Sequence, residues 1–353
     1  GAGTRNYTFS RYRYAFDFSG MEHLSRFNFD DIEFLLEGNA SGVILAKTGN
    51  MNCFRDCYFT RPRDRGITSI GSSCQGMLVD RCEFLSNEMG DLAQNRTTVA
   101  LNVNNNDAKI RHSRFIRFAH FAVMNGGGHM IEGNHWFQGD NAQNGVRFGG
   151  LVLTQTNLQA TVTGNYIDNC SIEWTNEHDP YPNFDGEEYS FGGLTITGNA
   201  LLATGSSGIN GGGGVFTAVG VPGNATVTIR NSTIAGNSSI AEAGGLGVGV
   251  NGVVTVVNTT VSGNQAQNGG GLGSGGFLTL TGSTVIGNTA TALGGGIGTV
   301  LSGVLEVANS LISNNRANGV STNCATAGGT MISRGNNLSD DATCTMFGAT
   351  DLA

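Results

Sequence analysis

The sequence predicts an all-β fold, a single-stranded right-handed parallel β-helix in which the chain winds through about 12 stacked coils. Three observations lead to this prediction. A short pattern recurs from end to end at intervals of 21 to 34 residues, apolar residues alternate with period 2 rather than 3.6, and glycine makes up 56 of the 353 residues. Such a period, combined with alternation, is typical of coils built from short strands and not of helix pairs.

The recurring pattern joins an apolar residue, a small polar residue, a variable position and an apolar or aromatic residue, as in RHSRF, EGNHW and VNTTV. Because buried peptide groups need hydrogen-bond partners, we expect the small polar side chains to satisfy the backbone where each coil bends. These positions are Cys57, Cys82, Ser113, Asn134, Asn165, Asn199, Ser232, Thr259, Ser283, Ser310 and Asn336. The apolar positions two residues after most of them are expected to form the core: Phe59, Phe84, Phe115, Trp136, Ile167, Leu201, Ile234, Val261, Val285 and Ile312.

A single coil cannot bury its own apolar face, so the coils must stack at the ~4.8 Å spacing of neighbouring strands. Residues in the same slot of successive coils then form ladders. The glycine runs Gly244-Gly245, Gly270-Gly271 and Gly295-Gly296 recur once per coil. We interpret them as tight corners and close backbone contacts, because a phosphate-binding glycine loop needs a strand-loop-helix context.

The composition excludes several partners. Charged residues are only 13% of the chain, and the formal net charge is −8 with a pI of about 5.2. This acidic balance disfavours nucleic acid and anionic lipid. No stretch approaches 18 consecutive apolar residues, so we expect no membrane insertion, and the opening GAGTRNYTFS lacks signal-peptide features, so any export signal is expected to have been removed or to lie upstream.

The composition also changes along the chain, near residue 200. Residues 1–199 hold 25 of the 28 aromatic residues and 38 of the 46 charged residues. We therefore distinguish an aromatic- and charge-rich part, 1–199, with a long loop at 170–193, from a Gly/Asn/Thr-rich part, 200–353, that continues the same solenoid and ends in closing coils at 320–353. The first part is expected to carry the chemistry and the second to serve as scaffold.

Two motifs alternate in the second part: Gly-Gly-Leu/Ile runs, and Ile/Val-x-x-Asn segments that end at Asn237, Asn264, Asn288 and Asn315. They resemble the GGA(I/L/V) and FxxN repeats of polymorphic outer membrane proteins, with Ile or Val in place of Phe, and still more the β-helix repeats of secreted bacterial surface proteins. The resemblance covers roughly residues 194–353 and implies surface exposure or adhesion. It also implies a disulfide between Cys324 and Cys344, which look like the paired cysteines of the closing coils in those proteins.

Residues 1–193, with the segments FRDCYF, VDRCEF, IRHSRFIRF and MIEGNHWF, resemble the pectin-lyase-like β-helix proteins of bacteria and their phages. That superfamily contains polysaccharide lyases, glycoside hydrolases and tailspikes, so the resemblance implies contact with polysaccharide. The polygalacturonase motifs and a pectate-lyase calcium cluster are absent from the sequence. Whether the chain is an enzyme therefore stays open, and an active form would be a polysaccharide lyase or a glycoside hydrolase.

The longest departure from the period, the loop at 170–193, is the first place to look for a binding site, because function in such a fold usually lies in long loops. Its candidate substrate-binding residues are Glu173, Trp174, His178, Asp179, Tyr181, Asp185, Glu187 and Glu188. Carboxylates can protonate or attack at a glycosidic bond, and flat rings pack on the apolar faces of sugars. The alternatives are a solvated acidic loop, a Ca²⁺ contact and a catalytic dyad.

A second candidate is the cluster Arg61-Pro62-Arg63-Asp64-Arg65. It is predicted to be a corner loop whose three guanidinium groups can hold the carboxylate of an acidic sugar by paired hydrogen bonds. Surface charges that pair with one another are the alternative interpretation.

Two further groups of residues remain. Basic residues from Arg111 to His120 alternate with phenylalanines and are expected to face outward, where His120 or His135 could act as a general base.

The seven cysteines lack CxxC zinc spacing, so we predict no metal site, and their odd number leaves at least one thiol unpaired within the chain. Cys57 and Cys82 are expected to be neighbours on adjacent coils.

These observations favour a secreted or surface-exposed β-helix protein, extracellular or at the cell surface, that binds polysaccharide or cell-surface glycan or once processed it. The rival hypothesis is a non-catalytic structural or adhesive surface protein, or a subunit of a larger extracellular or phage particle. Self-association is a possible property of either. No cofactor is predicted.

Overall fold

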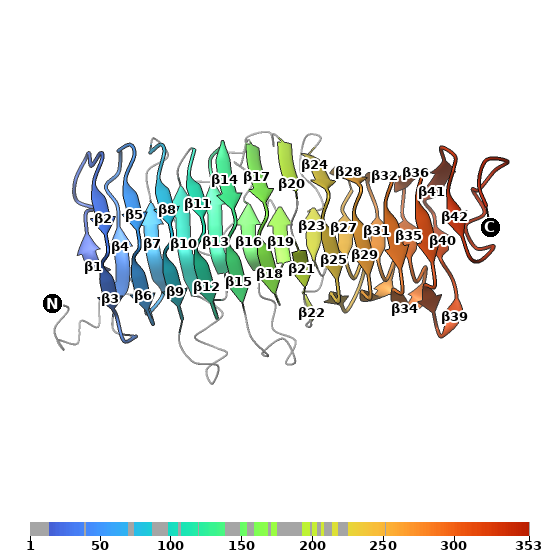
Figure 1. The fold of residues 1–353 in the computed structure, drawn as a ribbon, viewed down its shortest axis with the longest axis horizontal. Coiled ribbons are helices and arrows are strands. Elements are labelled where there is room, and N and C mark those ends of the chain that lie inside the picture. Colours follow the sequence, from blue (N-terminus) through green and yellow to red (C-terminus); the bar gives the residue numbers. More distant parts are fainter. Residues whose placement is uncertain are drawn as a thin grey trace.

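The computed structural model describes residues 14–38, 40–69, 74–86, 98–104, 107–118, 120–137, 149–153, 159–168, 171–174, 193–197, 200–202, 206–207, 214–217, 225–250 and 252–352. Within these ranges all regular elements are β-strands, so the prediction of an all-β parallel β-solenoid is confirmed. The strands stack into one long rod (Figure 1). None of the described residues forms a helix long and apolar enough to span a membrane.

Three sheets of 12 strands each follow the rod in the described part of the chain. Neighbours within a sheet come from successive coils and pair in parallel, so each coil gives one strand to every sheet. The first sheet consists of β1 (Tyr14–Asp17), β4 (Ser41–Ile44), β7 (Arg65–Ser69), β10 (Val99–Asn104), β13 (His120–Asn125), β16 (Gly149–Leu153), β19 (Ser171–Trp174), β23 (Val215–Thr217), β27 (Leu246–Val248), β31 (Leu272–Ser274), β35 (Ile297–Val300) and β40 (Cys324–Ala327).

The second sheet alternates buried residues with residues that face outward, because successive side chains of a strand point to opposite faces. In β28, for example, Val254 and Val256 are fully buried, whereas Val253 and Thr255 are partly exposed. This sheet consists of β2 (Asn28–Asp30), β5 (Cys53–Arg55), β8 (Leu78–Asp80), β11 (Lys109–Arg111), β14 (His129–Glu132), β17 (Gln159–Thr163), β20 (Gly193–Thr197), β24 (Ala225–Arg230), β28 (Gly252–Val257), β32 (Phe277–Thr281), β36 (Val304–Ala308) and β41 (Thr330–Ser333).

The strands of the third sheet follow those of the second after a corner of two residues, or four in the last coil. A shorter fourth sheet accompanies the Gly-rich half. The third sheet consists of β3 (Glu33–Leu35), β6 (Tyr58–Thr60), β9 (Glu83–Leu85), β12 (Arg114–Ile116), β15 (His135–Phe137), β18 (Tyr166–Asp168), β21 (Ala200–Leu202), β25 (Thr233–Ala235), β29 (Thr260–Ser262), β33 (Thr284–Ile286), β37 (Leu311–Ser313) and β42 (Leu338–Ser339). The fourth consists of β22 (Ser206–Ser207), β26 (Ser238–Ser239), β30 (Gln265–Asn268), β34 (Thr289–Leu293), β38 (Arg316–Ala317) and β39 (Val320–Ser321). Its last pair, β38 with β39, is antiparallel.

The core ladder that the sequence predicts is buried. The rings of Phe59 and Phe84 stack with centroids 4.6 Å apart, and those of Phe84 and Phe115 with centroids 5.0 Å apart. They overlap because in-register parallel strands place the same slot of successive coils side by side. In the Gly-rich half aliphatic side chains fill the slot and are fully buried: Ile234, Val261, Val285 and Ile312. The side chain of Leu201 lies outside the described residues.

The small polar ladder also forms, and it satisfies the backbone as expected. The N–H of Cys82 donates to Oγ of Ser113 at 3.1 Å, and the N–H of Ser113 donates to Oδ1 of Asn134 at 3.0 Å. The N–H of Asn134 in turn donates to Oδ1 of Asn165 at 2.9 Å. Each side chain therefore binds a peptide group of the preceding coil, which fixes the spacing at the corner.

One predicted member of this ladder is wrong. The N–H of Ser310 donates to Oδ1 of Asn337 at 3.0 Å, not to Asn336. Asn336 occupies the corner position one residue earlier, where the backbone is left-handed with a φ of 59°. The preceding members follow the prediction, from Ser232 through Thr259 and Ser283 to Ser310. Asn199, also predicted, lies outside the described residues.

The corner between the second and third sheets has a left-handed backbone in every described coil. The φ angle lies between 49° and 63° at Asp31, Asp56, Arg81, His112, Gly133, Gly164, Asn231, Asn258, Gly282, Asn309 and Asn336. Glycine and asparagine tolerate this conformation, whereas a long side chain such as that of Arg81 adopts it at a cost. The charged corners of the first coils are therefore a local departure from the best residue for the turn.

A second buried ladder occupies the Ile/Val-x-x-Asn positions of the Gly-rich half. Asn288 is typical: its backbone N–H and its Nδ2 both donate to Oδ1 of Asn315 at 2.9 Å, and Nδ2 also donates to the carbonyl of Val261 at 3.0 Å. Each amide thus joins three successive coils. The ladder consists of Asn237, Asn264, Asn288, Asn315 and Asn323, all 0% exposed.

The last asparagine, Asn323, has no further coil to bind. A short C-terminal segment takes the place of that coil. Its Nδ2 donates to Oδ1 of Asp340 at 2.7 Å and to Oγ of Ser339 at 2.8 Å. Its backbone N–H donates to Oδ2 of Asp341 at 2.9 Å. Side-chain oxygens of this segment, the C-terminal cap (residues 339–351), therefore take over the acceptor role of the missing coil.

The cysteines follow the sequence prediction. Cys324 and Cys344 form a disulfide with a Cα separation of 4.9 Å, which joins the last coil to the C-terminal cap. Cys57 and Cys82 are neighbours on adjacent coils, and the N–H that follows Cys82, that of Glu83, donates to the carbonyl of Cys57 at 2.9 Å. Both thiols are free and buried.

The recurring glycines lie where coils approach most closely. A Cβ added to Gly270 would lie 2.3 Å from the carbonyl oxygen of Thr289 and 2.4 Å from that of Gly295. No side chain fits in that space, so the interpretation of the Gly runs as close backbone contacts holds at this position.

Candidate functional site

Most of the predicted loop site cannot be placed in the structure. His178, Asp179, Tyr181, Asp185, Glu187 and Glu188 lie outside the described residues. Glu173 and Trp174 belong to β19 of the first sheet, where they pair with Val152 and Leu153 of β16. The loop site stays a prediction.

The predicted arginine cluster is divided by the fold. Arg61 forms an ion pair with Glu37 of the preceding coil, and the side chains of Arg63 and Asp64 approach to 3.7 Å. Arg65 lies in β7, whose five residues are all buried, and is itself 0% exposed. The prediction of one corner loop is therefore wrong for Arg65, which lies in a strand, and the pairing of Arg61 and Arg63 follows the alternative interpretation. Ligand binding by these arginines stays a prediction.

The structure instead brings charges together on the outer face of the second sheet. Five residues of alternating sign occupy the same slot of β2, β5, β8, β11 and β14, and we call them the charge ladder: Asp30, Arg55, Asp80, Arg111 and Glu132. Because neighbouring strands lie ~4.8 Å apart, each charge has opposite charges beside it. Arg55 lies 3.6 Å from Asp30, and Nε of Arg111 lies 3.1 Å from Oδ1 of Asp80.

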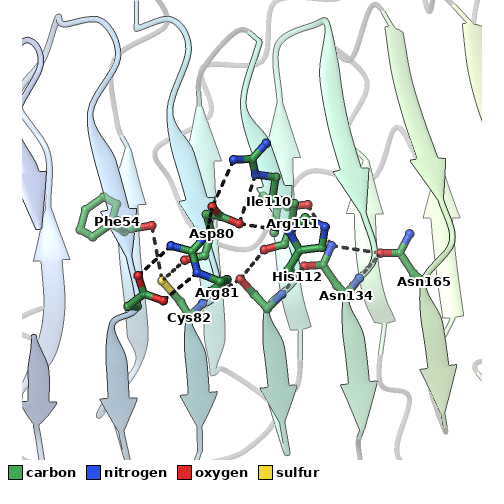
Figure 2. Close-up of polar contacts among 11 residues, drawn as sticks. Phe54, Asp80, Arg81, Cys82, Ile110, Arg111, His112, Asn134 and Asn165 are labelled. Atoms are coloured by element: carbon green, nitrogen blue, oxygen red, sulfur yellow. Dashed lines mark hydrogen bonds and ion pairs between the residues drawn. The ribbon is translucent and has the colours of Figure 1, made fainter. Parts of the chain in front are cut away.

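Asp80, the middle member of this ladder, lies among Arg81, Arg111 and His112 (Figure 2). Its carboxylate is buried, and the side chain is only 1% exposed. Oδ2 accepts hydrogen bonds from Arg81 at 2.8 Å and from Arg111 at 3.1 Å, and Oδ1 lies 3.2 Å from Nδ1 of His112. Arg81 also donates two hydrogen bonds of 2.8 Å to Asp56 on the preceding coil. One buried carboxylate thus binds three basic side chains.

These contacts fix the protonation state of the cluster. Burial by itself raises the pKa of Asp80, but hydrogen bonds from Arg111 and His112, together with the charges of Arg111 and Arg81, lower it below its ordinary value. The hydrogen bond with Asp56 and the nearby Asp80 raise the pKa of Arg81. Asp80 is therefore ionised at neutral pH and holds the basic groups in place.

A groove of about 650 Å³ runs over the same face, lined by residues of β2, β5, β8 and β11 and of the turns that precede them. This volume is within the range of small-ligand sites. Four of its lining side chains are cationic, Arg26, Arg55, Lys109 and Arg111, and one is a carboxylate, Asp107. An acidic chain with a net charge of −8 therefore has a locally cationic groove.

The cations of the groove differ in how far they are neutralised. Arg55 and Arg111 face Asp30 and Asp80 in the charge ladder. For Arg26 and Lys109, both exposed, the described part of the chain provides no ion pair. Their charges are available to a ligand without breaking a contact inside the protein.

The other lining residues suit a hydroxylated ligand. Asn28, Asn50 and Gln75 supply amide donors and acceptors, while Met51 and Leu78 supply apolar surface. Amides bind hydroxyl groups, and apolar side chains pack on the C–H faces of a sugar ring. The groove can therefore bind a polar, partly apolar molecule that carries negative charge.

Two further groups bear on reactivity. Burial raises the pKa of the Cys53 thiol in the groove, so the thiolate that would act as a nucleophile is disfavoured.

His112 lies at the exposed corner. Because a carboxylate only accepts hydrogen bonds, Nδ1 of His112 donates to Asp80. His135, one of the two histidines predicted as a general base, packs against the ring of Tyr166, with centroids 5.0 Å apart. Among the described residues no group of three or more His, Cys, Asp or Glu could hold a metal ion.

Sequence reasoning placed Arg111 and His112 on an outward-facing strand but missed the groove and Asp80. A signal existed: each member of the charge ladder from Arg55 onward precedes a small polar ladder residue by two positions, as Asp80 precedes Cys82. The alternation of sign from coil to coil becomes visible once the coils are aligned on that ladder.

The fold defines the class of this protein, an all-β parallel β-solenoid. Comparison with known proteins adds no family to that class: no family model, no curated protein and no solved structure matches the chain.

Proposed function

We propose that this chain is a secreted or surface-exposed β-solenoid protein that binds polysaccharide in the groove on the outer face of the second sheet. The observation that carries the proposal is the groove itself, with amide, apolar and charged side chains aligned over four successive coils. Four strands at ~4.8 Å spacing give a length of about 14 Å across the strands. That direction follows the rod, so a linear chain of sugars can continue past either end of the groove.

The disulfide supports the location outside the cytoplasm. The Cys324–Cys344 disulfide joins the last coil to the C-terminal cap, and disulfides persist in oxidising compartments and are rare in the cytosol. An extracellular or cell-surface location is also where polysaccharide is met as a polymer.

The experiment is a panel of acidic and neutral polysaccharides, with binding measured by affinity gel electrophoresis and product release measured in the same samples. Leu78→Trp fills the groove and is expected to abolish binding. Thr255→Trp is the matched control, because Thr255 occupies the same slot of the second sheet, six coils farther along the rod. Equal binding by both variants would contradict the proposed site.

The panel also addresses the second candidate function, a non-catalytic structural or adhesive surface protein. The observation in its favour is the long rod with three continuous sheets, which is suited to hold a partner at a distance from a surface (Figure 1). Absence of binding to every glycan would favour this candidate. Release of sugars would instead show that the chain is an enzyme.

A further inference from the structure

We propose that the ligand of the groove is an acidic polysaccharide, whose carboxylate or sulfate groups are bound by Arg26, Lys109, Arg55 and Arg111 while its backbone follows the rod. This inference rests on the proposed function, since it names the substrate class for the same groove. It goes further in one respect: a neutral glycan would leave Arg26 and Lys109 without an ion pair among the described residues.

The first argument is the position of the cations. Arg26 belongs to the turn before β2, and Lys109 is the first residue of β11, so the two lie at opposite ends of the groove. Arg55 and Arg111 lie at the third position of β5 and β11, at the other side of the strands. The cations are therefore distributed along the groove and not at one point, with one carboxylate, Asp107, among the lining residues. A repeating anion matches this arrangement better than a single charged group.

The second argument is the state of these cations before binding. Arg26 and Lys109 are exposed and lack ion pairs within the described residues, so binding an anion gains an attraction without breaking another. Arg55 and Arg111 keep 40% and 42% of their side-chain surface exposed while they face Asp30 and Asp80. Guanidinium groups have five donors, and those not bound to the protein remain for a carboxylate or sulfate.

The overall negative charge does not oppose this assignment. At physiological ionic strength charges are screened over about 8 Å, so distant acids act weakly on a ligand in the groove. The net charge of −8 does reduce attraction for a long, densely charged strand that extends along the rod. A glycan with one anion per sugar or per disaccharide is charged enough to pair with the cations of the groove and sparse enough to limit repulsion by the rest of the chain.

The uncharged lining distinguishes a sugar from other anions. Asn50 and Gln75 offer hydrogen bonds to hydroxyl groups, and Leu78 and Met51 offer apolar contact between the two lines of charge. A simple polyanion such as polyphosphate has neither hydroxyl groups nor C–H faces. The groove should therefore prefer an acidic glycan to polyphosphate of similar charge.

The test uses polygalacturonate and the same polymer after reduction of its carboxyl groups, together with dextran sulfate, dextran and polyphosphate. The full chain is expected to bind polygalacturonate or dextran sulfate, and to bind the carboxyl-reduced polymer and dextran about tenfold more weakly or not at all. The two anionic polymers distinguish carboxylate from sulfate. Affinity should fall as salt is raised.

The variant is Arg26→Gln with Lys109→Gln, which removes the two cations without ion pairs and leaves Asp80 and its partners unchanged. We expect at least about a tenfold loss of affinity for the acidic polymer and an unchanged circular dichroism spectrum. The matched control is Arg230→Gln with Arg316→Gln, which removes the same charge from the Gly-rich half. It should bind as the original chain does.

The outcomes separate this inference from the proposed function. Equal binding of neutral and acidic polymers, unaffected by the groove variant, would leave polysaccharide binding standing and overturn the acidic specificity. Failure to bind any glycan would overturn both. An equal loss in the control pair would show a general charge effect, and polyphosphate binding as tight as that of the glycan would show an unselective polyanion site; either result overturns the inference.

Discussion

At the scale of single residues, Asp80 is a buried carboxylate held among basic side chains. A carboxylate that is 1% exposed loses water, and it is stable there because Arg81, Arg111 and His112 supply hydrogen bonds and the two arginines supply positive charge. Its partners remain partly exposed, which weakens each attraction through solvent screening. Asp80 therefore positions the groove residue Arg111 as well as stabilising the corner.

Asp80→Asn tests this role. The amide keeps the shape but removes the charge and replaces one acceptor oxygen with an NH2 donor, so Arg81, Arg111 and His112 cannot all keep their hydrogen bonds, and we expect the free energy of unfolding to fall by about 1–3 kcal/mol. Urea unfolding followed by circular dichroism measures it. Asp56→Asn, in the exposed pair with Arg81, is the control and should cost less. Equal losses for the two variants would refute a special role for Asp80.

At the scale of an element, the Asn ladder couples one coil to the next. Asn288→Ala removes the acceptor shared by the N–H and Nδ2 of Asn264 and takes the amide donor from the carbonyl of Val261, all in the buried interior. We expect a loss of roughly 3 kcal/mol in the free energy of unfolding, because buried groups without partners lose their hydration. Thr255→Ala, on the outer face, should change it by less than about 0.5 kcal/mol. Similar midpoints for both variants in urea would show that the ladder contributes little.

The C-terminal cap is a second element with a predictable response, this time to pH. Burial opposes ionisation of Asp341, but hydrogen bonds from Thr343, Asn323 and Ser321 lower its pKa. Hydrogen bonds also lower the pKa values of Asp340 and Asp351, against the effect of burial. A folded-state pKa below the unfolded value of about 4 means that the stabilisation is present above that pH and disappears as pH falls through the folded pKa.

We therefore expect the last coils to open first in acid. Hydrogen exchange of residues 323–351 should quicken as the pH falls below about 4, after correction for intrinsic exchange rates, while the core ladder near Phe84 stays protected. Asp341→Asn removes one of the titrating groups and should reduce the pH dependence. Uniform opening of the whole rod at one pH would be the contrary result.

At the scale of the whole molecule, the fold is repetitive, so stability is approximately a sum of coils and of contacts between neighbouring coils. Removing the disulfide by Cys324→Ser with Cys344→Ser should lower the stability of the last coils by about 3 kcal/mol, as for a closed loop of similar size. Because the groove is formed at β2 to β11, glycan binding should be unchanged. Loss of binding in this variant would indicate coupling along the full rod. Thermal unfolding and affinity electrophoresis measure the two effects.

The whole-molecule architecture was predictable because it depends on what repeats. Phe59 and Phe84 share a slot that the spacing identifies, and the Gly270 contact follows from the same period. The ladder position at Asn336 was misplaced by one residue because two asparagines are adjacent there, and only the backbone conformation distinguishes corner from ladder. Burial of Arg65 and the role of Asp80 depend on neighbouring coils, whose alignment a single strand does not reveal.

The charge ladder and the groove are built from the same slots of successive coils, and this has a consequence for ligand length. Under the proposed function, no single side chain sets the length of the ligand. The number of coils that form the groove sets it, because each added coil lengthens the groove by ~4.8 Å. Duplicating the coil that contains β8 should therefore shift the preferred oligosaccharide to a longer one, and deleting that coil should shift it to a shorter one. Ligand length would then depend on the number of coils in the repeat.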